Sequence, residues 1–471
     1  MHYGSLLEMA SGAKVRVALI GLGDYGRSLL FQSLRVPGLE IVAVCDADRS
    51  RAETALRAAG LGKDHYVDCA NGNAAASAIK SGKIALLSDG AQMTDLPVDV
   101  VVEATGHPDA AAHHAALSIA NGKHVVMVSK EADSVVGPLL AKRAAAAGVV
   151  YTPVDGDQPS LLIQLALWAR VCGLDILSAA KSSEYDFVFD PAAETVTCVS
   201  QTVSVPGFAS LWGFGDRSPA EVIAAREAAL ADIPQRTVAD LTEMGIVANA
   251  LGLEVDRPDF HAPVARTQEI PDLLVPGGLL SGKNRVDVVN LLRRPDEFSL
   301  AGGVFVTVAC EDSYTWEFLR EKGHLVSRDG KAATIANPVH LLGVQSATTI
   351  LLAGLQKRSS GTGRVDAKYD LQGRAKQDLK AGTLLTPQGR HHEVEGIDGF
   401  LAPAAAVVTG APIPFHMMCN HRLRRDVAAG QILTLDDVDA PASSPLWELR
   451  AEMDRELLAK AASVGGGHGL P

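Results

Sequence analysis

A glycine-rich turn between an apolar strand and a helix constrains the fold of this chain most strongly. Gly21, Gly23 and Gly26 form a G-x-G-x-x-G pattern that directly follows the apolar run of residues 15–20 and opens a helical pattern. The first glycine permits a tight turn, the second lets a pyrophosphate approach the backbone, and the third lets helix and strand pack closely. Asp46 ends the next apolar strand, where a carboxylate can accept hydrogen bonds from a ribose 2′-hydroxyl. The pattern therefore predicts a dinucleotide-binding βαβ unit and not an unoccupied glycine turn.

The same alternation of strand and helix continues to about residue 180. Apolar runs such as residues 98–104, 124–128 and 149–154 are typical of parallel strands that are buried on both faces. We therefore predict an α/β protein whose N-terminal domain, residues 1–155, has the Rossmann fold. Ligands of such sheets bind beyond the carboxyl ends of the strands. The loops expected there are 21–26, 46–51, 105–108, 129–133 and 155–159.

The rest of the chain predicts further domains. After residue 155 the strand and helix signals mix with long Gly/Pro loops, which is typical of an α+β domain. Two similar phrases, residues 375–385 and 424–433, each run from a basic residue and an aspartate to a glycine turn and a short strand. The predicted regions are a central α+β catalytic domain over 156–358, whose helix 337–355 returns to the first domain, a Ser/Gly linker over 359–363, a compact β-rich module over 362–445, and a C-terminal helix with a disordered tail over 446–471.

Composition restricts the partners and the compartment. A chain of 471 residues is too long for one core, so several domains are expected. The net charge of −12 argues against nucleic acid or an anionic membrane surface as a partner. The six cysteines are scattered without a C-x-x-C pair, as in a cytoplasmic protein with reduced thiols. We find neither a signal segment nor an apolar run long enough to span a membrane.

The chain resembles the homoserine dehydrogenase-like oxidoreductases, and more closely their DXR-like branch, which carries a C-terminal SAF domain. The resemblance spans nearly the whole chain. Its motifs are the glycine loop 21–26, Ala104-Thr105-Gly106, residues 121–126, Glu131-Ala132-Asp133, residues 155–160, Val275-Pro276-Gly277-Gly278 and the two glycine-turn phrases. It implies an NAD(P)-dependent enzyme, an SAF (β-clip-like) fold for residues 362–445, and self-association through the second domain into a homo-oligomer.

A lysine distinguishes between the activities that the resemblance implies. Lys130 follows the strand 124–128, as it does in homoserine dehydrogenases, whereas the reductoisomerase-like members lack this lysine. We therefore expect hydride transfer between nicotinamide and a small hydroxylated carbonyl or alcohol substrate, with or without a phosphate group. One alternative is a 1-deoxy-D-xylulose 5-phosphate reductoisomerase-like enzyme of isoprenoid synthesis. The other is a non-enzymatic sensor or scaffold that binds a nucleotide or a sugar acid.

Hydride transfer needs a positive charge for the developing alkoxide and a group that moves a proton. Lys130 is the first candidate because its loop lies at the ligand edge of the predicted sheet. Lys181, at the end of the strand 175–180, is the second, with a salt-bridged loop lysine as the equal alternative. Asp155 and Asp157 flank Gly156 and are predicted to orient substrate hydroxyls, hold a lysine or share a divalent cation. For Asp157, capping of the helix that begins near Pro159 is the alternative.

The cofactor is predicted to be NAD or NADP. Asp46 favours NAD because a 2′-phosphate would meet a carboxylate, but Arg49 and Arg51 lie close enough in sequence to bind that phosphate. Ser182, Ser183 and Glu184 are expected to bind the substrate, and no metal ligands are assigned. His107, His261 and His340 are isolated histidines, of which only His107 is placed near the cofactor. The full set of predicted cofactor-binding residues is Gly21, Gly23, Asp24, Tyr25, Gly26, Asp46, Arg49, Thr105, Gly106, His107 and Ser129.

Overall fold

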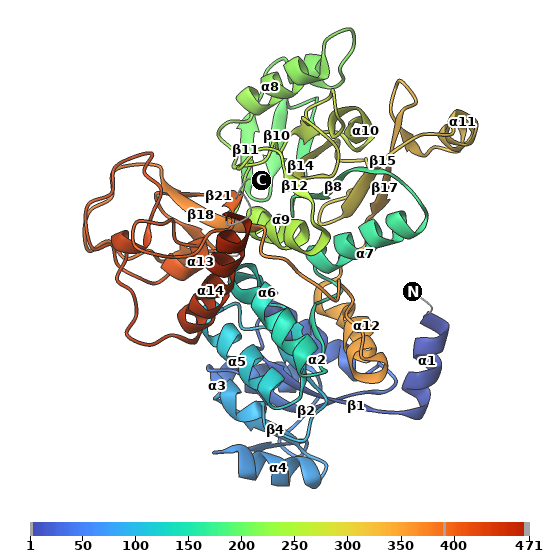
Figure 1. The fold of residues 1–471 in the computed structure, drawn as a ribbon. Coiled ribbons are helices and arrows are strands. Elements are labelled where there is room, and N and C mark those ends of the chain that lie inside the picture. The colour runs from blue at the N-terminus through green and yellow to red at the C-terminus, as the bar shows by residue number, and fades with distance from the viewer. Residues whose placement is uncertain (1–2, 390–391, 466–471) are drawn as a thin grey trace, which may run out of the picture. The chain divides into compact units, whose positions relative to one another are not determined.

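The computed structural model describes residues 3–389 and 392–465, which form two compact units (Figure 1). The first unit comprises residues 1–160, 341–398 and 402–471, and the second comprises residues 161–340 and 399–401. The chain therefore leaves the first unit after residue 160, returns to it at residue 341, and leaves it again only for residues 399–401. Among the described residues, no helix combines the length and the apolar character needed to cross a membrane.

The first unit is built on a seven-stranded sheet in which every pair of strands is parallel. Its order is β3 (Tyr66–Asp68), β4 (Ile84–Leu87), β2 (Leu39–Cys45), β1 (Val15–Ile20), β5 (Val100–Glu103), β6 (His124–Met127) and β7 (Tyr151–Pro153). After β1 the chain forms β2 on one side of β1, and it later forms β5 on the other side, so the strand order reverses at β1. This reversal is the position where a Rossmann sheet binds its ligand. The predicted α/β fold with an N-terminal Rossmann sheet is confirmed.

Alternation along β1 places apolar side chains on both faces of the sheet. Val15, Val17 and Leu19 belong to one buried cluster, and Ala18 and Ile20 belong to another. This period of two is expected of a strand that is covered on both sides. The helices of this region are α1 (Tyr3–Gly12), α2 (Asp24–Ser33), α3 (Arg49–Ala58), α4 (Gly72–Lys80), α5 (Pro108–Ala120) and α6 (Lys130–Ala146).

The segment that returns to the first unit contains a short helix, α12 (Ser346–Leu351), followed by a π-helical turn (Leu352–Gln356). Ile350 and Ala353 are buried in the same cluster as Val15 of β1. The predicted helix over 337–355 is wrong in its extent, because residues up to Asn337 pair as a strand and only residues from Ser346 onward are α-helical. The Ser/Gly stretch that follows is held in place: Ser360 is buried, and its backbone N–H donates to Thr152 Oγ1 at 3.0 Å.

The second unit contains a mixed sheet. Its strands are β8 (Ile176–Ser182), β9 (Phe187–Asp190), β10 (Thr195–Cys198), β11 (Gln201–Ser204), β12 (Glu254–Val255), β13 (Val264–Ala265), β14 (Arg285–Arg293), β15 (Val304–Ala309), β16 (Leu325–Val326) and β17 (Ala332–Asn337). β8 pairs with β14 in parallel and with β15 antiparallel. The helices are α7 (Gln158–Val171), which begins in the first unit, α8 (Pro219–Ala229), α9 (Val238–Leu251), α10 (Ile270–Leu273) and α11 (Ser313–Glu321).

The last region contains β18 (Tyr369–Ala375), β19 (Pro387–Gln388), β20 (Glu393–Val394), β21 (Ile397–Pro403), α13 (Phe415–Met418) and α14 (Pro445–Gly465). The two glycine-turn phrases pair with each other through Leu379 and Val427, whose backbone groups exchange hydrogen bonds of 2.8 and 2.9 Å. Assignment of this region to the SAF fold stays a prediction. α14 continues to Gly465, and the rest of the predicted disordered tail, residues 466–471, lies outside the described residues.

Candidate functional site

The glycine turn after β1 has the geometry that a bound pyrophosphate needs. Gly21 has φ +93, and a Cβ there would lie 2.4 Å from the carbonyl oxygen of Ala104. A Cβ at Gly26 would lie 1.9 Å from the carbonyl oxygen of Gly21. A Cβ at Gly23, in contrast, would meet nothing within 4 Å. The outer glycines are therefore required for packing, while the middle one leaves open space at the N-terminus of α2, where phosphates are favoured. These residues fit a dinucleotide.

Asp46 organises the neighbouring turn. Its buried carboxylate accepts hydrogen bonds from the backbone N–H groups of Leu22 and Asp48, both at 2.8 Å. Arg51 Nη1 lies 3.6 Å from the same carboxylate. Arg49 contacts Asp68 and Glu53 instead. Of the two arginines considered for a 2′-phosphate, the structure thus places only Arg51 beside Asp46.

A cavity of about 470 Å³ opens at the carboxyl ends of β1, β2 and β5. Of the predicted cofactor-binding residues, Gly21, Gly23, Asp46, Thr105 and His107 line it. Asp24 is the first residue of α2. Tyr25 donates its hydroxyl to the carbonyl oxygen of Asp155 at 3.1 Å, which directs it toward the returning segment. The structure therefore assembles only part of the predicted set around one cavity.

Glu103, which the sequence analysis missed, connects two of the predicted loops. It ends β5 and is fully buried. Its carboxylate accepts a hydrogen bond from Thr105 Oγ1 at 2.7 Å and another from Ser129 Oγ. The N–H of Gly106 donates to Ser129 Oγ at 2.8 Å, so the loops after β5 and β6 are held together. A carboxylate at the end of an otherwise apolar strand is the sequence signal for this role.

Lys130 and Asp157 are brought together. Lys130 is the first residue of α6, directly after β6, and its Nζ lies 3.4 Å from Asp157 Oδ1. The N–H of Gln158 also donates to this oxygen at 3.1 Å. Lys130 retains some exposure, because 24% of its side chain is accessible. An ammonium oriented by a carboxylate at the ligand edge of the sheet can polarise a carbonyl oxygen.

Asp155 has different partners from Asp157. Its carboxylate accepts hydrogen bonds from Ser160 Oγ at 2.7 Å and from Thr348 Oγ1 at 2.6 Å. Its backbone N–H donates to Thr349 Oγ1 at 2.8 Å. These bonds attach α12 to the end of β7. The two aspartates therefore have different hydrogen-bond partners, and their shared role in the site stays a prediction.

In the second unit, Lys181 lies inside β8 and not at the end of a strand over 175–180, so the predicted boundary is wrong. Its side chain is 1% exposed and contacts Asp240 at 2.7 Å and Glu243, both on α9. Burial opposes the charged form, but these two carboxylates outweigh it and raise the pKa of Lys181 above its usual value. This geometry favours the salt-bridge alternative, but the lysine lies in a strand and not in a loop, and its ion pairs attach α9 to the sheet.

The three predicted substrate-binding residues that follow Lys181 have different surroundings. Ser182 is buried, and its hydroxyl donates to the carbonyl oxygen of Leu300 at 2.7 Å. Ser183 donates its backbone N–H to the carbonyl oxygen of Val289 at 2.9 Å. Glu184 is half-buried beyond the end of β8. Ser182 thus serves the packing of the sheet, and the proposed substrate role of Ser183 and Glu184 stays a prediction.

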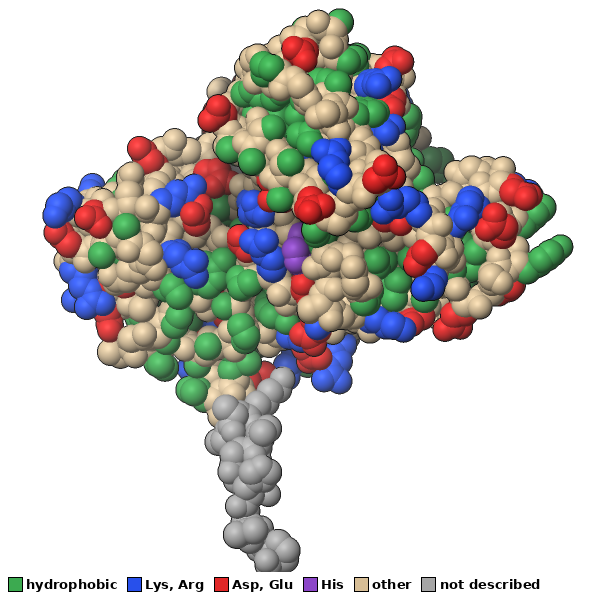
Figure 2. All heavy atoms as spheres, turned by 90° about the horizontal axis from the view of Figure 1, so that it is seen from above, with side chains coloured by type: hydrophobic (Ala, Val, Ile, Leu, Met, Phe, Trp, Pro, Cys, Tyr) green, Lys and Arg blue, Asp and Glu red, His purple; other side chains and the backbone are tan. Residues whose placement is uncertain are grey.

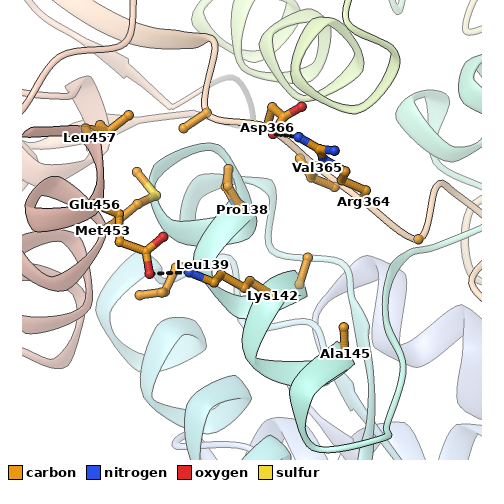
Figure 3. A pocket seen from close by; sticks show the side chains of 13 residues that line it. Pro138, Leu139, Lys142, Ala145, Arg364, Val365, Asp366, Met453, Glu456 and Leu457 are labelled. Carbon is orange, nitrogen blue, oxygen red and sulfur yellow. Dashed lines mark hydrogen bonds and ion pairs between the residues drawn. The ribbon is translucent and has the colours of Figure 1, made fainter. Parts of the chain in front are cut away.

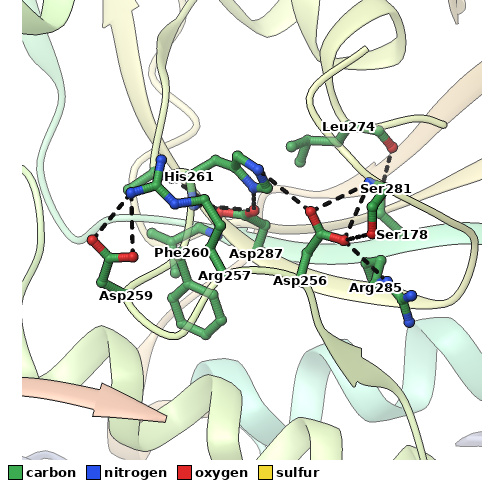
Figure 4. Close-up of polar contacts among 12 residues, drawn as sticks. Ser178, Asp256, Arg257, Asp259, Phe260, His261, Leu274, Ser281, Arg285 and Asp287 are labelled. Atoms are coloured by element: carbon green, nitrogen blue, oxygen red, sulfur yellow. Dashed lines mark hydrogen bonds and ion pairs between the residues drawn. The ribbon is translucent and has the colours of Figure 1, made fainter. Parts of the chain in front are cut away.

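His261 is not isolated, contrary to the sequence analysis (Figure 4). Its Nδ1 lies 2.7 Å from Asp287 Oδ2, and its Nε2 lies 3.4 Å from Asp256 Oδ2. The residues on either side, Phe260 and Ala262, have positive φ values of 59 and 46. Asp287 is fully buried and accepts the N–H of Ala262 at 3.1 Å, so it fixes both the ring and the unusual loop. A second polar cluster of the central region is therefore built around His261.

Two further observations concern possible ligand sites. Among the described residues, no group of three or more His, Cys, Asp or Glu side chains is placed to hold a metal ion. A second cavity of about 370 Å³ lies between α6, α14 and residues 363–367 (Figure 3). Lys142 and Glu456 form an ion pair of 2.6 Å beside its apolar lining. Figure 2 shows Lys/Arg and Asp/Glu side chains interspersed on one face of the molecule.

Comparison with known families supports the assignment of two regions. Residues 21–153 match the family model for the homoserine dehydrogenase NAD-binding domain, and residues 230–346 match the model for the catalytic domain of oxidoreductase DRL. These two matches indicate an NAD-binding domain and an oxidoreductase catalytic domain in the two regions. The resemblance to homoserine dehydrogenase-like and DXR-like oxidoreductases is confirmed for these regions.

Solved structures give partial likenesses. The myo-inositol dehydrogenase of Lactobacillus casei, in complex with NAD(H) and myo-inositol, is 20% identical over 38% of this chain and 47% of that chain, with a TM-score of 0.26. The 1-deoxy-D-xylulose 5-phosphate reductoisomerase of Zymomonas mobilis, in complex with NADPH, is 15% identical over 36% and 46%, with a TM-score of 0.27. A DOX-P reductoisomerase with magnesium is 16% identical over 51% and 57%, with a TM-score of 0.30. The chain thus spans about half the length of these structures. No curated protein sequence matches it.

Proposed function

We propose that this protein transfers a hydride between a nicotinamide cofactor and a small hydroxylated carbonyl or alcohol substrate. The observation that carries the proposal is the position of Lys130. It begins α6 at the carboxyl end of β6, in the loop that Ser129 and Glu103 join to the cofactor-side loop of Thr105. A nicotinamide bound at this sheet edge supplies the hydride acceptor or donor.

Each residue of this site has a distinct part in the proposed reaction. Lys130 stabilises negative charge on the substrate oxygen as the alkoxide develops, and it can return a proton to that oxygen. Asp157 holds the ammonium of Lys130 in place through their 3.4 Å contact. Asp46 binds the adenosine ribose and favours NAD over NADP, because a 2′-phosphate would meet its carboxylate. The substrate binds as a small molecule, with the polar residues Ser183 and Glu184 as its proposed contacts.

Cofactor binding is the first test. Purified protein is titrated with NADH and with NADPH while nicotinamide fluorescence is followed. We expect the protein to bind both coenzymes and to form the tighter complex with NADH. If neither coenzyme binds, the proposed function is wrong.

Turnover is the second test. Polyols and sugar acids are screened for reduction of NAD, and the best substrate is used to compare Lys130→Met with Lys142→Met. Lys142 lies on the same helix but forms a surface ion pair with Glu456. We expect Lys130→Met to lower kcat by about 100-fold or more with little change in NADH affinity, as for loss of an oxyanion contact. The control variant should retain wild-type kcat.

The same screen separates the alternatives. A sensor or scaffold would bind the coenzyme without turnover of any substrate. A reductoisomerase-like enzyme would oxidise NADPH with 1-deoxy-D-xylulose 5-phosphate and a divalent cation. Self-association is also part of the proposal, and sedimentation of the purified protein measures it directly.

A further inference from the structure

The C-terminal region brings a histidine to the cofactor side of the first unit. His392 directly precedes β20, and its Nδ1 lies 3.4 Å from Glu131 Oε1 on the first turn of α6. Only 12% of the Glu131 side chain is exposed, compared with 29% for His392. This contact therefore joins a buried carboxyl group to a partly accessible imidazole. Glu131 is the neighbour of Lys130 in the chain.

His392 also lies beside the loop that follows β5. A methyl group added at Gly106 would come within 3.9 Å of His392 Cε1. Gly106 follows Thr105, which lines the cavity at the glycine turn. His392 is thus next to two of the loops that the proposed function assigns to the cofactor. Its backbone has φ 55, an unfavourable value for a residue with a β-carbon, and such conformations concentrate at functional sites.

Several charged and titratable groups face this pair. Those around Glu131 and His392 among the described residues are Lys130 on α6, Glu103 on β5, Asp157 after β7, and His416 and Cys419 from the region of α13. Burial raises the pKa of Glu131 to about 7, and Lys130 opposes the rise. Burial lowers the pKa of His416 to about 3, so this neighbour is neutral. The charge beside Lys130 can therefore change near neutral pH.

We propose that His392 and Glu131 form a proton-sharing pair at the nicotinamide end of the cofactor site, so that the C-terminal region completes this site. The inference rests on the proposed function. In the absence of cofactor the pair binds a single dissociable proton, which is partly dissociated near neutral pH. A positively charged oxidised nicotinamide favours the carboxylate of Glu131, and the proton leaves the pair for solvent through the more exposed imidazole. The neutral reduced ring has no such effect. His392 acts through Glu131 and is therefore a positioning residue.

Proton release on cofactor binding tests this proposal without requiring turnover. Binding of NAD⁺ and of NADH is measured by calorimetry at pH 7 in phosphate and in Tris, whose different ionisation enthalpies report the number of protons exchanged. A fall of one unit in a pKa that starts near 7 releases roughly 0.4 proton per site. We expect about this release with NAD⁺ and little or none with NADH.

Three variants identify the group that releases the proton. Glu131→Gln should abolish the release and His392→Asn should reduce it, and both variants should retain NAD⁺ binding. Asparagine suits the left-handed backbone at residue 392, so this variant keeps the loop conformation. His421→Gln is the matched control, because His421 belongs to the same region but packs against Trp447. It should release as many protons as the wild type, and thermal melting checks that every variant is folded.

The outcomes are distinguishable. If the wild type binds neither coenzyme, the proposed function fails, and the pair loses its role with it. If the wild type binds NAD⁺ but releases no proton, or if His392→Asn releases as many protons as His421→Gln, the proposed pair is wrong and the proposed function stands.

Discussion

At the scale of single residues, the candidate site shows how different partners distinguish two buried carboxylates that are close in sequence. Asp155 and Asp157 are two positions apart. Asp155 accepts hydrogen bonds from the hydroxyl groups of Ser160 and Thr348, whereas Asp157 faces Lys130. A buried carboxylate is stable when hydrogen bonds or a cation compensate its desolvation. Asp155 meets that condition by holding the returning segment, and Asp157 meets it through an ammonium that remains partly accessible to ligands.

Glu131 gives a pH dependence of stability. Burial raises its pKa from 4.5 to about 7 in the folded protein, so the folded state prefers the protonated form. The resulting stability is present below pH 4.5 and is lost as the pH rises through 7. Between pH 5 and pH 8 we therefore expect the wild type to lose up to about 3 kcal/mol relative to Glu131→Gln. Urea unfolding of both proteins without cofactor at the two pH values measures this difference.

Asp133 provides an internal reference for that measurement. It lies on the same helix, and burial raises its pKa to about 6. Because it is present in both proteins, its contribution cancels in the comparison. Parallel pH profiles for the wild type and Glu131→Gln would show that Glu131 is ionised in the folded protein across this range.

The sequence predicted this site in part, for a physical reason. Apolar strands and glycine turns are local patterns, so the first sheet, the turn at Gly21 and the carboxylate at Asp46 could be recognised from short windows. The contact between Glu131 and His392 joins positions far apart in the chain, and no local period reports it. Lys181 was placed at a strand end, whereas Asp240 and Glu243 of α9 pair with it inside β8.

At the scale of elements, the two glycine-turn phrases form a nearly symmetric pair. The carboxylate of Asp426 accepts the N–H of Ala381 at 2.9 Å, and that of Asp378 accepts the N–H of Ala429 at 2.9 Å. Each aspartate therefore fixes the turn of the other phrase. This reciprocal arrangement explains why an aspartate precedes the turn in both phrases. The similarity in sequence was visible at once, but the pairing of the phrases required the structure.

Arg450 determines how α14 is attached to β18. Its fully buried guanidinium forms two hydrogen bonds of 2.7 Å to Asp370 and another of 2.7 Å to Asp454. Replacing it with leucine leaves both carboxylates buried without their cation. We expect Arg450→Leu to lower the free energy of unfolding by about 3–5 kcal/mol, measured by urea denaturation.

A surface ion pair of the same helix provides the control. Arg143 of α6 lies 2.5 Å from Glu452 of α14, but both side chains are about one third exposed. Because solvent screens such a pair, Arg143→Leu should cost less than about 1 kcal/mol. Equal losses for the two variants would contradict the special role of the buried arginine.

At the scale of the whole molecule, the cofactor-side unit is assembled from both ends of the chain. Residues 1–160 share it with residues 341–398 and 402–471. The N–H of Leu446 at the start of α14 donates to Asp109 of α5 at 3.1 Å, and α14 lies beside α5 and α6 (Figure 1). The cooperative unit of folding should therefore include the C-terminal region together with the dinucleotide-binding sheet.

Hydrogen exchange with and without NADH tests this organisation. A ligand that binds only the folded state stabilises it by about 2.7 kcal/mol when its concentration is 100 times Kd. Amides that exchange only through opening of the whole unit should then slow by the corresponding factor, roughly 100-fold. We expect such slowing in β18 and α14 as well as in β1 and β5. The edge hairpin β10–β11 of the second sheet serves as the reference and should change little. Protection confined to residues 15–160 would mean that the C-terminal region unfolds independently of the sheet that it covers.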